Sequence, residues 1–273
     1  MPWMRFEGPA YWGLFVVAFL AVAVWETWRP GRPLAWPVER RWGCHGLLFA
    51  VTAVVQTTVL RLSAVVVAVA VAGSHWGILN RPWLPFAVRS AAAVLLLDLA
   101  HYLTHRAFHA VYPLWRIHEV HHSDPDYDVS TGARFHPIET VLTQGAYLAV
   151  VAALAPPPVA VFAAELLTIL MNFFVHANAA LPGWAERALR YVIVTPGLHR
   201  IHHSEEVVEQ SRNFGQTFSF WDRAFDTYLP AANAGGSMVT GIKGLQNETS
   251  LRLWFTLREP FRRRTQPTAD PAA

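Results

Sequence analysis

The sequence predicts an all-α polytopic membrane protein with about four to five transmembrane helices. Hydrophobic residues make up 53% of the 273 residues and charged residues only 15%, a lower charged fraction than soluble domains usually have. Apolar runs long enough to cross a bilayer recur along the chain. The first run has tryptophan at both ends, where interfacial side chains anchor membrane helices.

The composition also excludes several classes of protein. The net charge is +3, and it comes mostly from arginines that flank apolar segments instead of forming a basic run interleaved with aromatics. We interpret them as topology determinants and lipid-headgroup contacts, and expect no nucleic-acid partner. Cys44 is the single cysteine, so a disulfide framework and a cysteine-based metal site are excluded. A bound metal would need nitrogen or oxygen ligands.

The first two apolar runs predict the N-terminal membrane part. Residues 11–28 form the first helix; a cleaved signal peptide is the alternative, but further apolar segments favour a membrane helix. Residues 29–46 are rich in proline, glycine and arginine and predict a connector. The run at 47–72 is interrupted by Arg61 and predicts either one long tilted helix or two shorter pieces.

The later apolar runs predict a third helix and a hairpin. The third helix starts near Leu84 and ends with "LAHYLTHRAFH". A single helix over the next run, residues 140–175, would be about 54 Å long, whereas the hydrocarbon core is about 30 Å thick. Three prolines at 156–158 therefore predict a turn between two helices. The basic segment 259–273 predicts a disordered tail.

Arginine placement predicts the orientation. The first connector contains four arginines, whereas the connector after the second run contains only Arg81. The positive-inside rule then places the first connector in the cytoplasm. If residues 47–72 cross the membrane once, the third helix and the hairpin both end on the cytoplasmic face. All the histidine clusters described next would lie there.

Eleven of the 13 histidines lie between residues 101 and 203, at helical spacing. His101, His105 and His109 are four residues apart, and the pattern HxxHH occurs at 118–122 and again at 199–203. Residues three or four apart share one face of a helix, so these rings would converge. One such motif could be a solvated surface. Its repetition, on segments that the topology gathers at one membrane face, favours a metal site. His45 and His75 are isolated, and we assign them no metal role.

The number of imidazoles favours two metal ions over one. A closed structural zinc site needs four ligands, and at least nine are present here. Imidazole suits zinc, copper, iron and nickel. A dinuclear centre beside a membrane, without an obvious nucleophile, favours oxygen chemistry on a lipid; hydrolysis at two zinc ions is the competing hypothesis. A metal carrier is a third, although its ligands should follow the membrane helices as a path.

The histidine motifs resemble the three histidine boxes of the fatty acid hydroxylase/sterol desaturase superfamily. The boxes are "HRAFH", "HEVHH" and "HRIHH", in that order. The segments "STGARFHPIE", "FFVHAN", "TPGLHRIHHS" and "NFGQTFSFWDRAFDTY" are similar to bacterial members, so the resemblance covers roughly residues 90–230. The glycine usual before the final "TY" is Asp226 here.

The resemblance implies a membrane-bound di-iron oxygenase with a cytosolic helical cap over the membrane helices. It implies nine metal ligands, which are His105, His109, His118, His121, His122, His176, His199, His202 and His203. Some members have a further histidine four residues after the isolated one, but that position is Ala180 here. Asp124 and Asp126 are not expected to be ligands, because the imidazoles alone are sufficient.

Several other polar residues are candidates for a supporting role. His101, His136, Asp98 and Asn178 could act as additional ligands or orient a ligand, and Glu139 could orient a ligand in the same way as Asn178. For Asp98, a polar residue at the helix exit is an equal alternative. Glu165 lies inside an apolar helix and is either functional or part of a buried hydrogen-bonded pair.

We therefore predict hydroxylation or desaturation of a lipid C–H bond with O2 and two iron ions. Residues 1–83 would form N-terminal membrane helices, 84–230 the catalytic domain, and 231–273 a C-terminal segment. No dinucleotide fingerprint, cysteine cluster or HPGG haem motif occurs. Electrons would come from a separate donor of the cytochrome b5, ferredoxin or reductase type.

Overall fold

The computed structural model describes residues 2–74 and 76–263, and over these residues it is helical, as predicted. Isolated bridges such as Ile193–Phe218 are the only β-type pairing in this part of the chain. Five of its helical spans are long and apolar enough to cross a membrane. The main helices of these spans are α1 (Glu7–Trp28), α2 (Val38–Leu60), α4 (Phe86–Ala110), α6 (Pro137–Leu154) and α7 (Pro158–Val175).

The second apolar run forms two helices, of which one is long enough to cross the membrane. After α2, Arg61 adopts a left-handed conformation (φ 54°), and the hydroxyl of Ser63 accepts a hydrogen bond from Val66 N to begin α3 (Ala64–Val71). The eight residues of α3 extend only about 12 Å. The alternative of one continuous helix over 47–72 is therefore wrong.

The predicted connector at 29–46 is too long, because α2 begins at Val38. Its polar first turns fold as a helix since they have partners elsewhere: Arg41 and His45 are both buried against the loop that follows the second histidine box. Sequence polarity alone gave the wrong boundary here because tertiary contacts override it.

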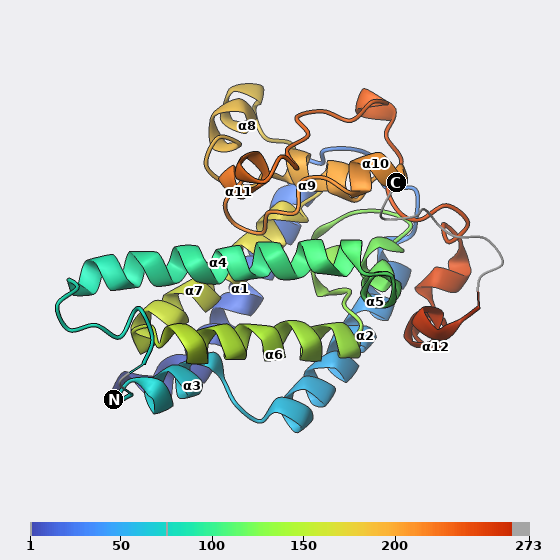
Figure 1. Ribbon diagram of the computed structural model, residues 1–273. Coiled ribbons are helices and arrows are strands. Elements are labelled where there is room, and N and C mark those ends of the chain that lie inside the picture. Colours follow the sequence, from blue (N-terminus) through green and yellow to red (C-terminus); the bar gives the residue numbers. More distant parts are fainter. Residues whose placement is uncertain (1, 75, 264–273) are drawn as a thin grey trace.

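The proline turn lies where it was predicted. Between α6 and α7, Ala155 is left-handed (φ 47°) and Pro158 starts the new helix. The indole of Trp76 donates to the carbonyl of Ala152 at 2.9 Å, so the segment before α4 crosses over this turn. The hairpin turn and the histidine-bearing ends of α4 and α7 are thus at opposite ends of the bundle (Figure 1).

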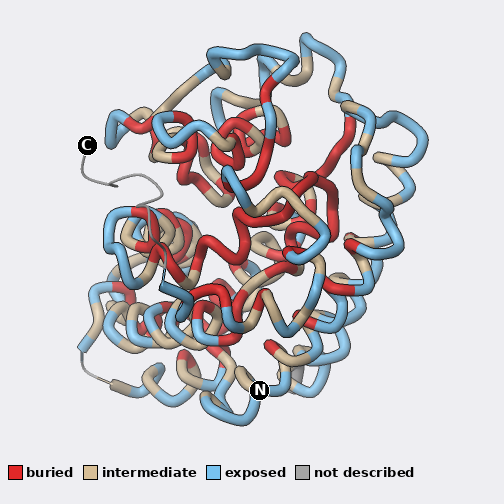
Figure 2. Tube along the Cα trace, turned by 90° about the vertical axis from the view of Figure 1, so that its right-hand side faces the viewer, coloured by how far each residue is buried: buried red, intermediate tan, exposed pale blue. Residues whose placement is uncertain are grey.

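Helix α7 is the centre of the bundle and packs against α1, α3 and α4. One apolar core joins α3 to the hairpin through Ala64, Ala68 and Val161, and another joins α1 to Phe173. Figure 2 shows exposed and partly exposed residues along the coils near the N-terminus and more continuous burial in the opposite layer. Many exposed positions on the long helices are apolar, as expected for surfaces that face lipid.

Short helices and loops form a cap over the end of the bundle that carries the histidines. These elements are α5 (Tyr112–His122), η2 (Val129–Ala133), α8 (Gly183–Leu189), α9 (Pro196–His202), α10 (Val207–Gln210), α11 (Phe220–Ala224), η3 (Gly235–Ser237), η4 (Glu248–Leu251), α12 (Leu253–Arg258) and η5 (Glu259–Phe261), and η1 (Pro2–Phe6) lies at the opposite end of the bundle. Asp226 has φ 57°, which explains why glycine is usual there, and aspartate tolerates this conformation better than most residues.

The start of the predicted tail is folded. Arg116 donates to the carbonyl oxygens of Glu259 and Arg262, and Glu259 is buried. The expectation of disorder is therefore wrong for residues 259–263. Residues 264–273, to which the rest of that prediction applies, lie outside the described residues, as does His75.

Candidate metal centre

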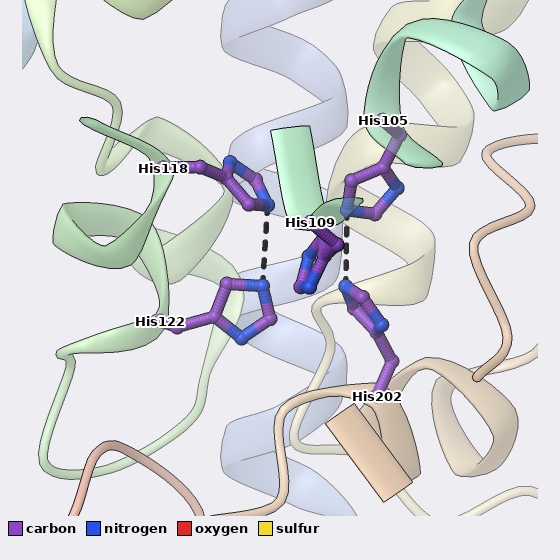
Figure 3. A group of neighbouring side chains, drawn as sticks. All are labelled: His105, His109, His118, His122 and His202. Carbon is purple, nitrogen blue, oxygen red and sulfur yellow. Dashed lines mark hydrogen bonds between the residues drawn. The ribbon is translucent and has the colours of Figure 1, made fainter. Parts of the chain in front are cut away.

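The nine histidines of the predicted ligand set come together in two adjacent groups. Within each group, one ring nitrogen of every member lies within 4.8 Å of those of the others. The first group is His105, His109, His118, His122 and His202 (Figure 3). The second group is His121, His176, His199 and His203. No aspartate, glutamate or cysteine of the described residues belongs to either group.

The two HxxHH motifs divide their side chains between the groups in a reciprocal way. On α5, His118 and His122 enter the first group and His121 enters the second. On α9 and its C-cap, His199 and His203 enter the second group and His202 enters the first. Each motif therefore gives its i and i+4 rings to one group and its i+3 ring to the other. This exchange explains why the same spacing occurs twice.

Local sequence signals position the helices that carry these rings. Pro113 lies in the first turn of α5 and Pro196 in that of α9, where proline is favoured. The hydroxyl of Thr195 accepts a hydrogen bond from Leu198 N and caps α9. Gly132 lies against α7: a Cβ there would be 3.0 Å from Asn172 Nδ2 and 3.2 Å from His176 Nδ1. An added Cβ would press against both side chains, so glycine suits this close approach.

Hydrogen bonds on the outer side of several rings fix their orientation. Nδ1 of His105 donates to the carbonyl of Phe214 (2.9 Å), and Nδ1 of His202 donates to the carbonyl of Arg212 (2.8 Å). His176 Nδ1 donates to the carbonyl of its own helix at Asn172 (2.6 Å). A carbonyl only accepts, so each of these rings has its proton on Nδ1 and, when neutral, a lone pair on Nε2.

The inner nitrogens then require a cation. Nε2 of His105 and Nε2 of His202 are 3.0 Å apart, and both carry lone pairs when the rings are neutral. Two lone pairs that face each other in a buried site repel. Two imidazoles bound to one metal at about 2.1 Å and at right angles would be about 3.0 Å apart. The donor set therefore fits metal ions.

The remaining close contacts have the same spacing. His118 and His122 approach through Nε2 at 3.2 Å, while in the second group His176 lies 3.2 Å from His121 and 3.1 Å from His199. Burial lowers the pKa of His118 to about 3 and that of His176 to about 4. It also lowers the pKa of His202 and His203 well below the ordinary value, with neighbouring imidazoles adding to the effect. At neutral pH these rings are uncharged and can ligate a metal.

Glu139 orients one of these rings from α6. Its Oε1 lies 2.6 Å from Nδ1 of His118, and both side chains are buried. A carboxylate that accepts from the outer nitrogen fixes the tautomer and makes the ring a stronger ligand. The weak sequence indication for Glu139 is therefore confirmed as a contact.

Changing Glu139 should weaken metal binding without moving the helices. We expect Glu139→Ala to reduce metal affinity by about 10–100-fold, the usual cost of removing such a partner. Glu139→Gln should lose less, because the amide oxygen can still accept from His118. Metal competition titrations of wild type and both variants measure their metal affinities. Equal affinities in wild type and Glu139→Ala would contradict the orienting role.

The four residues predicted as possible additional ligands or orienting residues, His101, His136, Asp98 and Asn178, lie outside both histidine groups. Asp98 accepts from Thr217 N (3.1 Å), from Phe218 N (3.2 Å) and from the indole of Trp221 (3.0 Å). These hydrogen bonds hold the segment 217–221 against α4. The side chain of Asn178 bonds the backbone of Arg32, with its oxygen accepting from N and its amide donating to O. Both residues hold the cap in place.

The two remaining histidines also lie outside the groups. The ring of His101 stacks on that of Tyr147, with centroids 4.8 Å apart. His136 caps α6, where its Nδ1 accepts from Ile138 N (3.2 Å). The spacing of four residues predicted that His101 shares a helix face with His105. Because His101 lies one turn further from the end of α4, its ring reaches the wall of a cavity instead of the metal groups.

A buried ion network, which was not predicted from the sequence, holds the loop after the second histidine box. The guanidinium of Arg41 donates to both oxygens of Asp124 (2.9 and 2.8 Å) and to Asp128. Burial alone would raise the pKa of Asp124, but Arg41 outweighs it and holds the pKa below its ordinary value. Asp126 accepts from the backbone of Ala35 at 2.7 Å. Both aspartates are thus used away from the metal groups, as expected.

A cavity of about 290 Å³ leads from the histidines into the bundle. His105, His118, His121, His176 and His199 line one part of it, so both groups face the same space. Most of the remaining wall comes from α1, α2, α4, α6 and α7, and Phe135 and Gln216 add to it from loops. A molecule in this cavity would reach the candidate metal centre from the membrane-spanning part of the protein.

Comparison with known proteins gives a consistent family. The model of the fatty acid hydroxylase family matches residues 90–227. The chain is similar to alkylglycerol monooxygenase of Danio rerio, with 30% identity over 142 residues that cover 52% of this chain and 30% of that protein. It is similar to ornithine lipid hydroxylase of Rhizobium tropici, with 25% identity over 66% of this chain and 52% of that one.

A third relative is aligned over more of its length. Methylsterol monooxygenase 1 of Danio rerio is 24% identical over 78% of this chain and 70% of its own. The chain spans about a third to a half of the alkylglycerol monooxygenase and ornithine lipid hydroxylase sequences. No solved structure matches it significantly. The family match covers half of the chain, includes all nine grouped histidines, and shows that the protein belongs to the fatty acid hydroxylase family.

Proposed function

We propose that the protein is a membrane-bound di-iron oxygenase that hydroxylates or desaturates a C–H bond of a lipid with O2 and external electrons. The observation that carries this proposal is the pair of buried imidazole groups that face one cavity in the membrane-spanning bundle. The names of the relatives support lipid oxidation in general, because they describe hydroxylation or monooxygenation of three different lipids.

The two groups of histidines would each hold one iron ion. When bound, the iron pair would supply the reduction of O2 and the oxidation of the C–H bond. Hydroxylation consumes one O2, two electrons and two protons, and it yields the alcohol and one water. The second group has four imidazoles and the first has five.

The protein's own residues would keep the rings neutral and fixed and would position the lipid. Carbonyl oxygens and Glu139 orient the rings, and the cavity would hold the reacting carbon away from bulk water. Electrons would come from a separate donor, of the cytochrome b5, ferredoxin or reductase type. The arginine-rich connector contacts the cap through Arg32, which donates to Thr240 (2.5 Å). We therefore propose that the centre lies on the cytoplasmic face.

Purified protein tests this function directly. We expect about two iron ions per chain and O2 consumption that depends on an added reductant and a lipid extract. Mass spectrometry of the lipids should reveal a gain of one oxygen atom or a loss of two hydrogens. Two zinc ions per chain and turnover without oxygen would support a hydrolase and reject the proposal.

A further inference from the structure

The inner part of the cavity is lined by polar side chains that lack protein partners. Gln56 of α2, Gln144 of α6 and Glu165 of α7 all line it. Among the described residues, none of the three forms a side-chain hydrogen bond or an ion pair with another residue. The alternative of a hydrogen-bonded pair for Glu165 is therefore wrong for this part of the chain.

Two tyrosines belong to the same region. Tyr11 and Tyr147 line the cavity together with Glu165. Tyr147 is only 4% exposed, and its hydroxyl has no hydrogen-bond partner. We call Gln56, Gln144, Tyr147 and Glu165 the inner polar cluster.

Gln56, Gln144 and Glu165 are half-buried and the hydroxyl of Tyr147 is fully buried, so the cluster has hydrogen-bonding capacity that a ligand in the cavity could use. Unpaired polar groups away from water cost a few kcal/mol each, and ionisable residues in membrane helices are rare and usually functional. Purely apolar walls would suit a hydrocarbon chain better. At the histidine end, Asn172 donates to the carbonyl of Gly132 at 2.7 Å, and the unpaired ring nitrogens of His121 and His199 belong to the candidate metal centre. The inner polar cluster is thus unpaired hydrogen-bonding capacity that lies outside the candidate metal centre.

We propose that the inner polar cluster binds a hydroxyl group of the lipid substrate, an inference that rests on the proposed function. A hydroxyl both donates and accepts, which matches a carboxyl group, two amides and a phenol. Along α7, Glu165 and His176 are separated by about 16 Å, since each residue rises about 1.5 Å. The lipid therefore has its hydroxyl at one end and the oxidised C–H bond at the other, with an apolar body between.

A hydroxyl fits the cluster better than an ammonium group. Removing a cation from water costs far more than removing a neutral hydroxyl, unless a full charge pair forms. One carboxyl group among neutral amides and phenols is a donor and acceptor set for a neutral ligand. The expected substrate therefore differs from lipids that have a plain hydrocarbon at this end.

Binding of simple probes to the iron-loaded protein in detergent tests the inference. Hexadecan-1-ol and hexadecane differ by one hydroxyl, and equilibrium dialysis gives their dissociation constants. We expect wild type to bind the alcohol at least about 10-fold more tightly, because a site built for a hydroxyl rejects the analogue without it. Glu165→Leu and Gln56→Leu should each lower this ratio severalfold, and Tyr147→Phe, which removes one oxygen, provides a milder variant.

Thr57→Val is the matched control. Thr57 follows Gln56 but is absent from the cavity wall, and its hydroxyl bonds its own helix at Ala53 O. It should keep the wild-type ratio. Equal binding of the two probes by wild type, an unchanged ratio in Glu165→Leu, or tighter binding of hexadecylamine would each overturn the inference. A preserved alcohol preference in protein that holds iron but oxidises no lipid would reject the proposed function and leave the hydroxyl site standing.

Discussion

Replacing His202 by alanine should remove both bound metal and oxygenase activity. His202 Nε2 lies 3.0 Å from His105 Nε2, and its outer nitrogen is fixed by the carbonyl of Arg212. Loss of the ring removes one of the five imidazoles that would hold the metal ion of the first group. Loss of an outer-shell partner alone costs about 10–100-fold, so we expect a loss of activity of at least about 100-fold.

His121→Ala should have a similar effect through the second group. The ring lies 3.2 Å from His176 Nε2, and it stacks on Phe135 with centroids 4.4 Å apart. Iron content per chain and reductant-dependent O2 consumption measure both variants. Circular dichroism should show that the helix content of each is unchanged, because the long helices are held by apolar contacts away from the centre.

His136→Asn provides the control for a lost imidazole. His136 is buried and caps α6, but it lies outside both groups. Asparagine is also a good N-cap residue, so this variant should keep its iron and its activity. Full iron content and activity in His202→Ala or His121→Ala would show that the changed residue is not a ligand.

Replacing Arg41 by leucine should destabilise the protein by about 3–5 kcal/mol, the usual cost of removing one partner of a buried ion pair. Arg41 is fully buried, and its loss would leave the carboxylates of Asp124 and Asp128 without their cation. Thr131 Oγ1 would remain as a donor to Asp124 at 2.7 Å. Because Asp124 follows His122 by two residues, the loop and the histidines should loosen together.

Arg40→Leu is a matched control on the neighbouring residue. Its ion pair with Glu248 at 2.7 Å is exposed on both sides, and such pairs contribute about 0–1 kcal/mol. Thermal unfolding of both variants in the same detergent measures the effect. The unfolding midpoint should be clearly lower for Arg41→Leu and little changed for Arg40→Leu. Similar midpoints for the two variants would show that the Arg41 network contributes little to stability.

The sequence was enough to predict the histidines and the helices that carry them. The i, i+3 and i+4 spacing fixes a shared helix face, and the same rule predicts convergence on each of α4, α5 and α9. The prolines at 156–158 fixed the hairpin, because proline removes a helical hydrogen bond. These features depend on residues close in sequence, so they can be read without the fold.

The remaining features depend on contacts between distant residues. The carbonyl oxygens that orient His105 and His202 have no sequence signature, because every residue carries a carbonyl group. Arg41 looked like a topology determinant in a connector, yet it is a buried partner of residues more than eighty positions later. Asp98, a candidate for orienting a histidine, instead binds backbone at residues 217 and 218.

The exchange of rings between the two HxxHH motifs has a mechanical consequence. His121 and His122 are neighbours in the chain but belong to different groups, and the same is true of His202 and His203. Consecutive Cα atoms are about 3.8 Å apart, so two covalent links hold the groups at a fixed separation. A shift or rotation of α5 or α9 must displace rings of both groups at once. The separation of the two histidine groups is therefore limited by the backbone itself, and neither group can move without the other.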